Sequence, residues 1–217
     1  MSMKRVNIPK TWKMARKGKS KFVIRPLARA SSSMPLLSVL RDMLAVVKTR
    51  NEARKILLNS EVSVNSRIRK DERFPVQVFD YITLAKINKT YQLVLVNKKL
   101  AVKEVPAAQA EKRICKVIGK KMLNGKKTQL NLDNGFSILH EGNVKVNDSV
   151  VVDLKSMKIT KHIPLKEKSD VLVINGKNAG LAGSILSLKQ TPAGKFAVIK
   201  TSLGEKEVQI KNIMATE

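Results

Sequence analysis

The sequence predicts an α+β multi-module protein. Two observations support this prediction: basic residues are unevenly distributed along the 217-residue chain, and the apolar pattern changes from helical to alternating after about residue 58. We expect a basic, extended N-terminal arm over residues 1–34, a small α/β module over 35–84, a central, mostly β module over 85–168 and a last β module over 169–217.

The charge balance indicates a polyanionic partner. The chain has 43 Lys and Arg against 17 Asp and Glu, a formal net charge of +26, and residues 1–30 contain ten basic residues and no acidic one. Such a surface repels itself unless nucleic acid, an anionic membrane or an acidic protein neutralises it. A merely solvated basic face is the alternative. Aromatic residues are only 4%, which favours recognition of the backbone and shape of folded nucleic acid over stacking on single strands.

Several other classes of protein are disfavoured. No apolar run approaches the about 18 residues of a membrane span, and the first 30 residues contain no apolar core of a secretory signal. The single Cys115 cannot form an internal disulfide, which fits a reducing compartment, and is expected to be buried. His140 and His162 are not at metal-ligand spacing. We therefore expect no metal, no cofactor, no small-molecule substrate and no catalytic residue, since no catalytic motif is present.

The N-terminal arm is interrupted by Pro9, Gly18 and Pro26, and only Phe22–Ile24 has strand character. It is therefore expected to be extended and to lie along nucleic acid, where its charges are neutralised. The residues of the arm that we expect to bind are Lys4, Arg5, Lys10, Trp12, Lys13, Arg16, Lys17 and Arg25.

The second module starts with two predicted helices over residues 34–58. Pro35 suits a first helical turn, and the pattern Thr49-x-x-Glu52 is a capping box that restarts a helix. Residues 61–85 then alternate as strands around a basic turn. Guanidinium groups match phosphate oxygens, so a cationic groove is predicted between helices and turn, with a solvated helix face as the alternative. The residues expected to flank it are Arg50, Arg54, Lys55, Arg67, Arg69 and Lys70, and Arg41, Thr49 and Arg73 are further candidate binding residues of this module.

Short apolar runs and turn signals make the rest of the chain β. The predicted strands cover Leu93–Val96, Ile114–Ile118, Leu130–Leu132 and Val150–Leu154, and a short helix is expected over Pro106–Lys112. The expected turns are at Asn124-Gly125, Asn134-Gly135 and Asn147-Asp148.

A glycine series, Gly176-x-x-x-Gly180-x-x-Gly183, lies between two alternating apolar segments. Its glycines allow positive φ and close backbone approach, so Lys177 and Asn178 in this loop could lie on an RNA backbone. A simple turn is the alternative. The spacing fits neither a P-loop nor a dinucleotide-binding loop.

Three stretches, in this order, resemble the archaeal and eukaryotic small-subunit (30S/40S) ribosomal proteins of the S-four-e type. The first starts at Lys4-Arg5-x-x-x-Pro9-Lys10-x-Trp12, the second runs from Pro35 to Leu57, and the third is the glycine series. The stretch from Pro35 to Leu57 resembles an alpha-L RNA-binding domain, which some pseudouridine synthases and tyrosyl-tRNA synthetases also carry. The glycine series resembles a KOW motif, which implies a C-terminal SH3-like β-barrel. The lack of a basic tail after Met214 makes the chain more similar to archaeal members.

The resemblance implies a function. Members of this family bind small-subunit ribosomal RNA beside neighbouring ribosomal proteins, within the cytoplasmic ribosome, and catalyse nothing. Two alternatives use the same modules: an RNA-modifying enzyme and a transcription or elongation factor. A peripheral membrane protein is less well supported, because no helix pairs a basic face with exposed bulky aromatics. One departure concerns Ser60 and Ser66, where alpha-L domains commonly have glycine, so these turns must form without the residue that adopts positive φ most easily.

Overall fold

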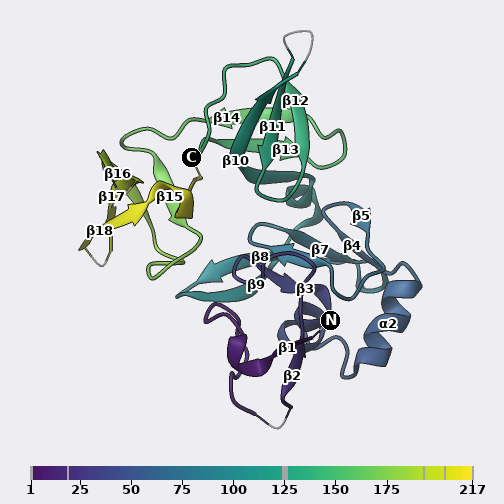
Figure 1. Ribbon diagram of the computed structural model, residues 1–217. Coiled ribbons are helices and arrows are strands. Elements are labelled where there is room, and N and C mark those ends of the chain that lie inside the picture. The colour runs from purple at the N-terminus through teal and green to yellow at the C-terminus, as the bar shows by residue number, and fades with distance from the viewer. Residues whose placement is uncertain (1, 19, 124–126, 193, 203, 217) are drawn as a thin grey trace. The chain divides into compact units, whose positions relative to one another are not determined.

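Antiparallel β-sheet dominates the computed structural model, which describes residues 2–18, 20–123, 127–192, 194–202 and 204–216 (Figure 1). The chain divides into two units, Met1–Glu111 and Lys112–Glu217, and each is described by itself. Within the described ranges, no helix combines the length and the apolar character needed to cross a membrane.

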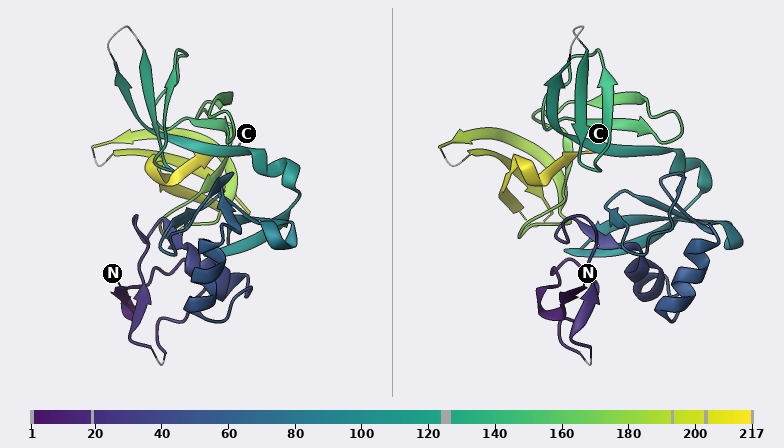
Figure 2. Two further views of the ribbon diagram at one scale, coloured as in Figure 1. Left: turned by 90° about the vertical axis from the view of Figure 1, so that its right-hand side faces the viewer. Right: turned by 45° about the vertical axis from the view of Figure 1, so that its right-hand side comes forward.

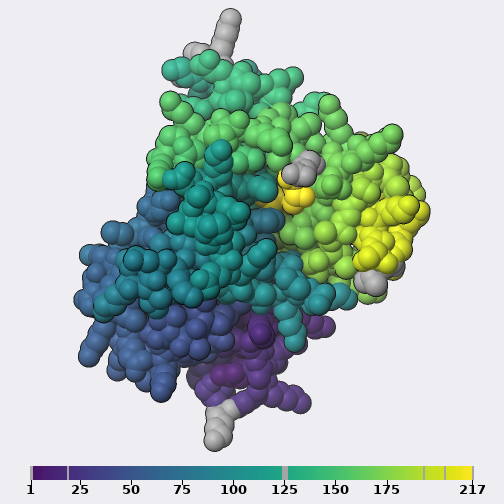
Figure 3. All heavy atoms as spheres, turned by 180° about the vertical axis from the view of Figure 1, so that it is seen from behind, coloured from purple at the N-terminus to yellow at the C-terminus, as the bar shows by residue number. Residues whose placement is uncertain are grey.

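The N-terminal segment is folded rather than extended throughout, which corrects the expectation for this arm. β1 (Ser2–Lys4) leads into a 3₁₀ turn, η1 (Arg5–Asn7), and pairs with β2 (Phe22–Ile24). The side chains of Ile8 and Trp12 are buried, and the Leu100 amide donates a 2.7 Å hydrogen bond to the Thr11 carbonyl. Figure 3 shows this segment, in purple, lying against the blue and teal residues of the same unit. Burial of a few isolated apolar side chains therefore anchors a segment whose charge pattern indicated an extended arm.

The two helices expected over residues 34–58 have different outcomes. The first is a single α turn, α1 (Leu36–Ser38), that continues as a π-helical turn, η2 (Val39–Met43), and it ends where Ala45 has φ of 53°. The second, α2 (Arg50–Leu58), is confirmed together with its capping box. The Glu52 amide donates to Thr49 Oγ1 at 3.2 Å, and the Thr49 amide donates to Glu52 Oε2 at 3.3 Å.

A five-stranded sheet in the order β5-β4-β7-β8-β9 forms the centre of the first unit, beside a two-stranded β3-β6 pair. This sheet includes strands on both sides of the predicted module boundary at residue 84. β7 and β8, which lie before and after the short 3₁₀ turn η3 (Ala85–Ile87), pair with each other. The predicted helix at Pro106–Lys112 is a 3₁₀ turn, η4 (Ala107–Glu111). The division into four modules remains a prediction. The strands are β3 (Ser33–Pro35), β4 (Val62–Val64), β5 (Arg67–Ile68), β6 (Pro75–Gln77), β7 (Tyr81–Leu84), β8 (Lys89–Val96) and β9 (Lys99–Val105).

Ser60 and Ser66 do adopt the backbone conformation that glycine favours, with φ of 60° and 62°. Ser66 follows Asn65, also at positive φ, in the two-residue turn between β4 and β5. The buried Asn65 side chain holds this turn: its Nδ2 donates to Asp80 Oδ1 at 2.7 Å, and its Oδ1 accepts from the Tyr81 amide at 3.0 Å. Side-chain hydrogen bonds thus stabilise the turn that glycine would otherwise ease.

The second unit contains two five-stranded sheets, shown in green and in yellow tones in Figure 2. The first has the order β12-β11-β10-β13-β14 and contains the predicted strands at 114–118, 130–132 and 150–154. Cys115 is buried in its core, as expected, with Val117, Leu130 and Val150. Its strands are β10 (Lys112–Met122), β11 (Thr128–Leu132), β12 (Ser137–His140), β13 (Ser149–Asp153) and β14 (Ile159–Ile163).

Two of the three expected turns in this region are confirmed. Gly135, between β11 and β12, has φ of 84°, and the Asn134 side chain accepts a 2.9 Å hydrogen bond from the Phe136 amide. Asn147 has φ of 79° just before β13. The Asn124-Gly125 turn lies outside the described residues.

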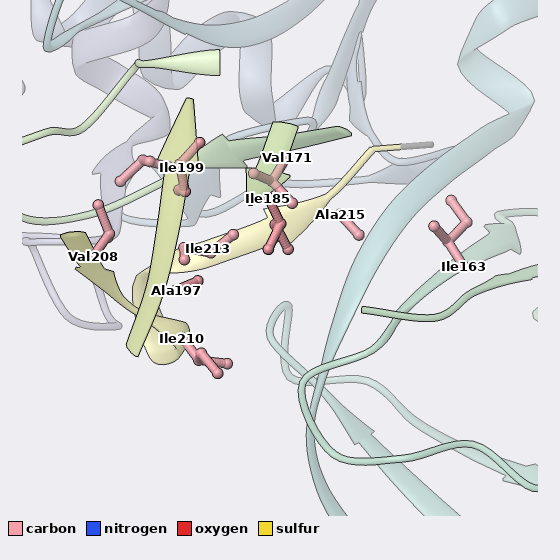
Figure 4. Close-up of a cluster of buried hydrophobic side chains, with 10 residues drawn as sticks. Ile163, Val171, Ile185, Ala197, Ile199, Val208, Ile210, Ile213 and Ala215 are labelled. Atoms are coloured by element: carbon pink, nitrogen blue, oxygen red, sulfur yellow. The ribbon is translucent and has the colours of Figure 1, made fainter. Parts of the chain in front are cut away.

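The second sheet of this unit has the order β18-β17-β16-β15-β19. Its core gathers Val171, Ile185, Ile199 and Ile213 between the strands (Figure 4). Among the described residues the hydrogen-bonded order runs open from β18 to β19, so a closed barrel remains a prediction. Its elements are β15 (Asp170–Val173), β16 (Ala182–Thr191), β17 (Gly194–Thr201), β18 (Gly204–Gln209), the 3₁₀ turn η6 (Ile210–Asn212) and β19 (Ile213–Ala215).

The glycines of the series have two different roles in this sheet. Gly176 and Gly180 have φ of 94° and 84° in the loop between β15 and β16. Gly183 lies at a close approach, because a Cβ there would come within 2.1 Å of the Lys200 carbonyl oxygen of β17. The expected positive φ and the expected close backbone approach are both confirmed, at separate positions.

A buried lysine joins the two sheets of the second unit. Lys116 is 5% exposed on β10, and its ammonium donates to the carbonyl oxygens of Ile210, Lys211 and Ile213 at 2.5, 3.2 and 2.6 Å. Desolvation by burial lowers the pKa of Lys116 to about 8, although the negative charge of Asp133 acts in the opposite direction. The three carbonyls belong to η6 and β19, so one side chain satisfies the hydrogen-bonding capacity of these backbone oxygens where the turn leads into β19.

This lysine predicts a pH-dependent stability. Because the unfolded chain holds the Lys116 proton up to its ordinary pKa of 10.5, and the folded chain releases it near pH 8, the unfolded state binds more protons between these values. The free energy of unfolding should therefore rise with pH in this window, relative to Lys116→Met, by up to about 1.4 kcal/mol per pH unit. Denaturant unfolding of both proteins at pH 7.5, 8.5 and 9.5 measures the difference. Parallel pH profiles for the two proteins would contradict it.

Candidate nucleic-acid interface

One buried carboxylate organises the predicted groove. Glu72, whose side chain is 8% exposed, accepts hydrogen bonds from the guanidinium groups of both Arg50 and Arg54, which are each 55% exposed. Arg50 binds it in a bidentate way, with Nε 2.8 Å from Oε2 and Nη2 contacting Oε1, and Arg54 Nη2 lies 3.2 Å from Oε1. The structure thus joins α2 to the basic turn through an acidic residue, Glu72, and the cationic groove itself remains a prediction.

The pairing fixes the charge of this cluster. The hydrogen bond from Arg50 lowers the pKa of the Glu72 carboxyl, and the same bond raises the pKa of Arg50. The stabilisation from this contact is present above the ordinary carboxyl pKa and is lost as pH falls through the lowered one. Two guanidinium groups share one carboxylate, so the cluster keeps one net positive charge and several N–H donors that face solvent.

Two other candidate arginines also have specific partners. Arg41 forms a bidentate pair with the adjacent Asp42, at 2.8 and 2.9 Å, and this hydrogen bonding raises its pKa. The Arg69 guanidinium lies 4.3 Å from the centroid of the Phe74 ring, and burial lowers its pKa, as does the nearby charge of Arg67. Their side chains are therefore oriented before any ligand binds, which reduces the entropy lost on binding.

Arg5 closes the loop between β1 and β2. Its Nε donates to the Ser20 carbonyl at 2.8 Å, its Nη1 to the Ala15 carbonyl at 2.9 Å, and its Nη2 to Ser20 Oγ. Arg16 binds the Val6 carbonyl from the other side of the same loop. All of these acceptors are neutral oxygens, so the positive charge of this loop is not compensated within it.

Trp12 is placed differently from the prediction. It is 2% exposed, so its ring is part of the interior of the first unit rather than a surface for nucleic acid. The other candidates of this segment lie at the surface: Lys4, Lys10, Lys13, Arg16, Lys17 and Arg25.

Most of the remaining candidate residues are exposed to solvent, as a contact with nucleic acid would require. In the first unit Lys55, Arg67 and Lys70 are exposed, whereas Arg73 is half-buried. In the second unit Lys177 is exposed and Asn178 is half-buried, both in the loop between β15 and β16.

An open hollow of about 500 Å³ brings three candidate arginines together. Arg5, Arg41 and Arg50 line it, with Phe22 and Leu37. The sequence placed the first of these in an arm and the other two in a separate module. The pairing of β1 with β2 and the packing of this segment against the rest of the unit bring them to one place.

Two residues of this candidate interface were not predicted from the sequence. Glu72 is an acid in a basic turn, and its sequence neighbours gave no indication that it would be buried. Phe22 was assigned only to a short strand, although its side chain is 55% exposed beside three arginines. An isolated exposed aromatic next to Lys21 is a weak signal that could have found it.

No metal centre accompanies these residues in the part of the chain that the structure describes, where no three His, Cys, Asp or Glu side chains cluster as ligands. His162 instead contacts the buried Asp148, with Nε2 2.8 Å from Oδ2.

The geometry gives a prediction for Arg50 and Arg54. Replacing both with Ala leaves the Glu72 carboxylate buried without these partners, so the variant should lose about 1–3 kcal/mol of unfolding free energy. The charge pattern alone predicts weaker RNA binding with little loss of stability, so the contacts with Glu72 change the expectation for stability. Denaturant unfolding measures the difference, and adding Glu72→Gln to the double variant should recover most of the loss.

Lys55→Ala provides the matched control, because this side chain is exposed on the same helix. Its unfolding free energy should stay near that of the parent chain. Equal stability of Lys55→Ala and of the double variant would show that Glu72 does not depend on the two arginines.

Comparison with known proteins agrees with this architecture. The model of Ribosomal family S4e matches residues 87–159. Small ribosomal subunit protein eS4 of Methanocella arvoryzae is 37% identical over 211 residues, which cover 94% of this chain and 89% of that protein. Small ribosomal subunit protein eS4 of Archaeoglobus fulgidus is 34% identical over 192 residues, which cover 87% and 80%.

A solved structure has a similar fold. The crystal structure of the 30S ribosomal protein S4e from Thermoplasma acidophilum superposes with a TM-score of 0.73 at 22% identity, over 85% of this chain and 94% of that one. With more than a third of residues identical to the Methanocella protein along nearly the whole length of both, the chain belongs to ribosomal family S4e.

Proposed function

We propose that this chain is a structural constituent of the small ribosomal subunit. It binds folded ribosomal RNA through phosphate contacts, lies beside neighbouring small-subunit proteins in the cytoplasmic ribosome, and supports subunit assembly and translation. Membership of the S4e family, whose curated relatives are named as small ribosomal subunit proteins, is the observation that supports this function best.

The charge distribution supports the RNA contact independently. The chain carries +26, and two acidic side chains of the candidate interface, Asp42 and Glu72, are already paired with arginines. The exposed cations of the N-terminal segment therefore need a polyanion from outside the chain. A-form RNA offers phosphates at close spacing, and guanidinium groups fixed in advance, such as those of Arg5 and Arg41, suit them.

The module assignments are part of the proposal. Residues 35–84 act as an alpha-L RNA-binding domain, with α2 and the basic turn on the RNA backbone, and residues 169–217 as a KOW module with an SH3-like barrel. The positive φ of Ser60 and Ser66 supports the first assignment, since these positions take the conformation of the glycines common in alpha-L domains. The positive φ of Gly176 and Gly180 supports the second, because these residues shape the loop that presents Lys177, and Gly183 allows β16 to approach β17 closely.

Sedimentation tests this function. A tagged copy in a cell lysate, run on sucrose gradients at low and moderate salt, is expected to migrate with the small ribosomal subunit at both salt concentrations. A copy that stays at the top of the gradient, or that migrates with RNA polymerase, would contradict the proposal and favour the transcription-factor alternative.

The surface lysines of the N-terminal segment should account for part of the salt dependence of binding. Replacing Lys4, Lys10, Lys13 and Lys17 with Ala should reduce the slope of log K against log salt by roughly 0.7–0.9 for each phosphate contact that is lost. Titration of a small-subunit rRNA transcript at several salt concentrations measures this slope. Arg at the same four positions keeps the charge and should keep the slope; a slope unchanged by the Ala substitutions would exclude these lysines from the interface.

A further inference from the structure

The hollow in the first unit is lined by both cationic and apolar residues. The cations are Arg5, Arg41 and Arg50, and the apolar residues include Phe22, Ile24 and Leu37. Its volume of about 500 Å³ lies within the range of roughly 300–1,000 Å³ of small-ligand pockets. Phosphate contacts alone would need only the cations, so the apolar residues favour a ligand that also has an apolar surface.

The three arginines that line the hollow are held by hydrogen bonds and still have N–H groups available for a ligand. Arg41 and Arg50 each bind a carboxylate through Nε and Nη2, so their Nη1 groups make no hydrogen bond among the described residues. Arg5 binds only neutral oxygens there, and so its charge remains uncompensated. Guanidinium groups fixed in this way favour an anion with several oxygens, such as a phosphate.

Phe22, one of the apolar residues that line the hollow, presents its aromatic ring to solvent. Phe22 belongs to β2 and is 55% exposed, although strand β2 itself is fixed by pairing with β1. The Lys21 ammonium lies over one face of this ring, 5.9 Å from its centroid, and adds positive charge there. An exposed ring on a rigid strand is a suitable surface on which a nucleobase can stack.

We propose that this hollow binds one unpaired nucleotide of an RNA strand, with its phosphate on the three arginines and its base stacked on Phe22. This inference rests on the proposed function and adds to it a preference for a bulged or looped-out residue. A base inside an A-form helix is already stacked between its neighbours and cannot reach Phe22, whereas an extruded base can.

The experiment compares two RNA hairpins that differ by a single bulged adenosine. Their affinities for the full chain are measured by fluorescence anisotropy at one salt concentration. The bulged hairpin is expected to bind more tightly, and Phe22→Leu is expected to lower the ratio of the two affinities by roughly 5- to 100-fold. Phe22→Trp keeps an aromatic ring and should preserve the ratio. Thermal unfolding of both variants checks that they are folded.

Each outcome decides the inference. A ratio that Phe22→Leu leaves unchanged, or that falls equally in Phe22→Trp, overturns it. Adenosine monophosphate competing as well as the bulged hairpin would overturn the RNA strand as the ligand, in favour of a free nucleotide. Equal affinity for both hairpins in a parent chain that still sediments with the small subunit would overturn only this inference, whereas failure to sediment would count against the proposed function.

Discussion

A shortage of acidic side chains determines how the cations of this protein are arranged. The chain has 17 Asp and Glu for 43 Lys and Arg, so most basic residues cannot each have an acidic residue of their own. The buried Glu72 is shared by Arg50 and Arg54, and Asp42 orients Arg41. The acids near the interface therefore act as orienting groups more than as neutralising ones. The folded chain therefore keeps most of its excess positive charge uncompensated, as the proposed contact with RNA requires.

The parts of the fold that depend on local sequence could be predicted. Helix α2 follows from its capping box, and the strands of the second unit follow from short apolar runs between turn residues. The first predicted helix is present but short, because it ends after Met43 and the chain turns at Ala45 against its helical pattern. The extended arm was wrong, since the Leu100 amide binds the Thr11 carbonyl and Trp12 is buried, so a lone aromatic in a basic stretch was misassigned to the surface.

The candidate site was predictable in its chemistry but not in its grouping. Residue types and spacing identified Arg5, Arg41 and Arg50 as candidates. Their convergence at one hollow depends on the pairing of β1 with β2, for which the sequence offered only the three residues Phe22–Ile24. For Glu72 and Lys116, in contrast, the residue type itself gave no indication of a special role. Each is an ordinary charged residue in the sequence, and only tertiary packing makes each of them a central contact.

The position of β19 has a consequence for the order in which the chain can fold as it is synthesised. β15 lies between β16 and β19 in its sheet. The acceptors of the Lys116 ammonium are the carbonyl oxygens of residues 210, 211 and 213, which are synthesised more than 90 residues later. Until residues 210–215 leave the exit tunnel of a translating ribosome, β15 is an open strand edge and Lys116 has no acceptors there. The second unit can therefore complete this sheet and satisfy the Lys116 ammonium only after residues 210–215 have been synthesised.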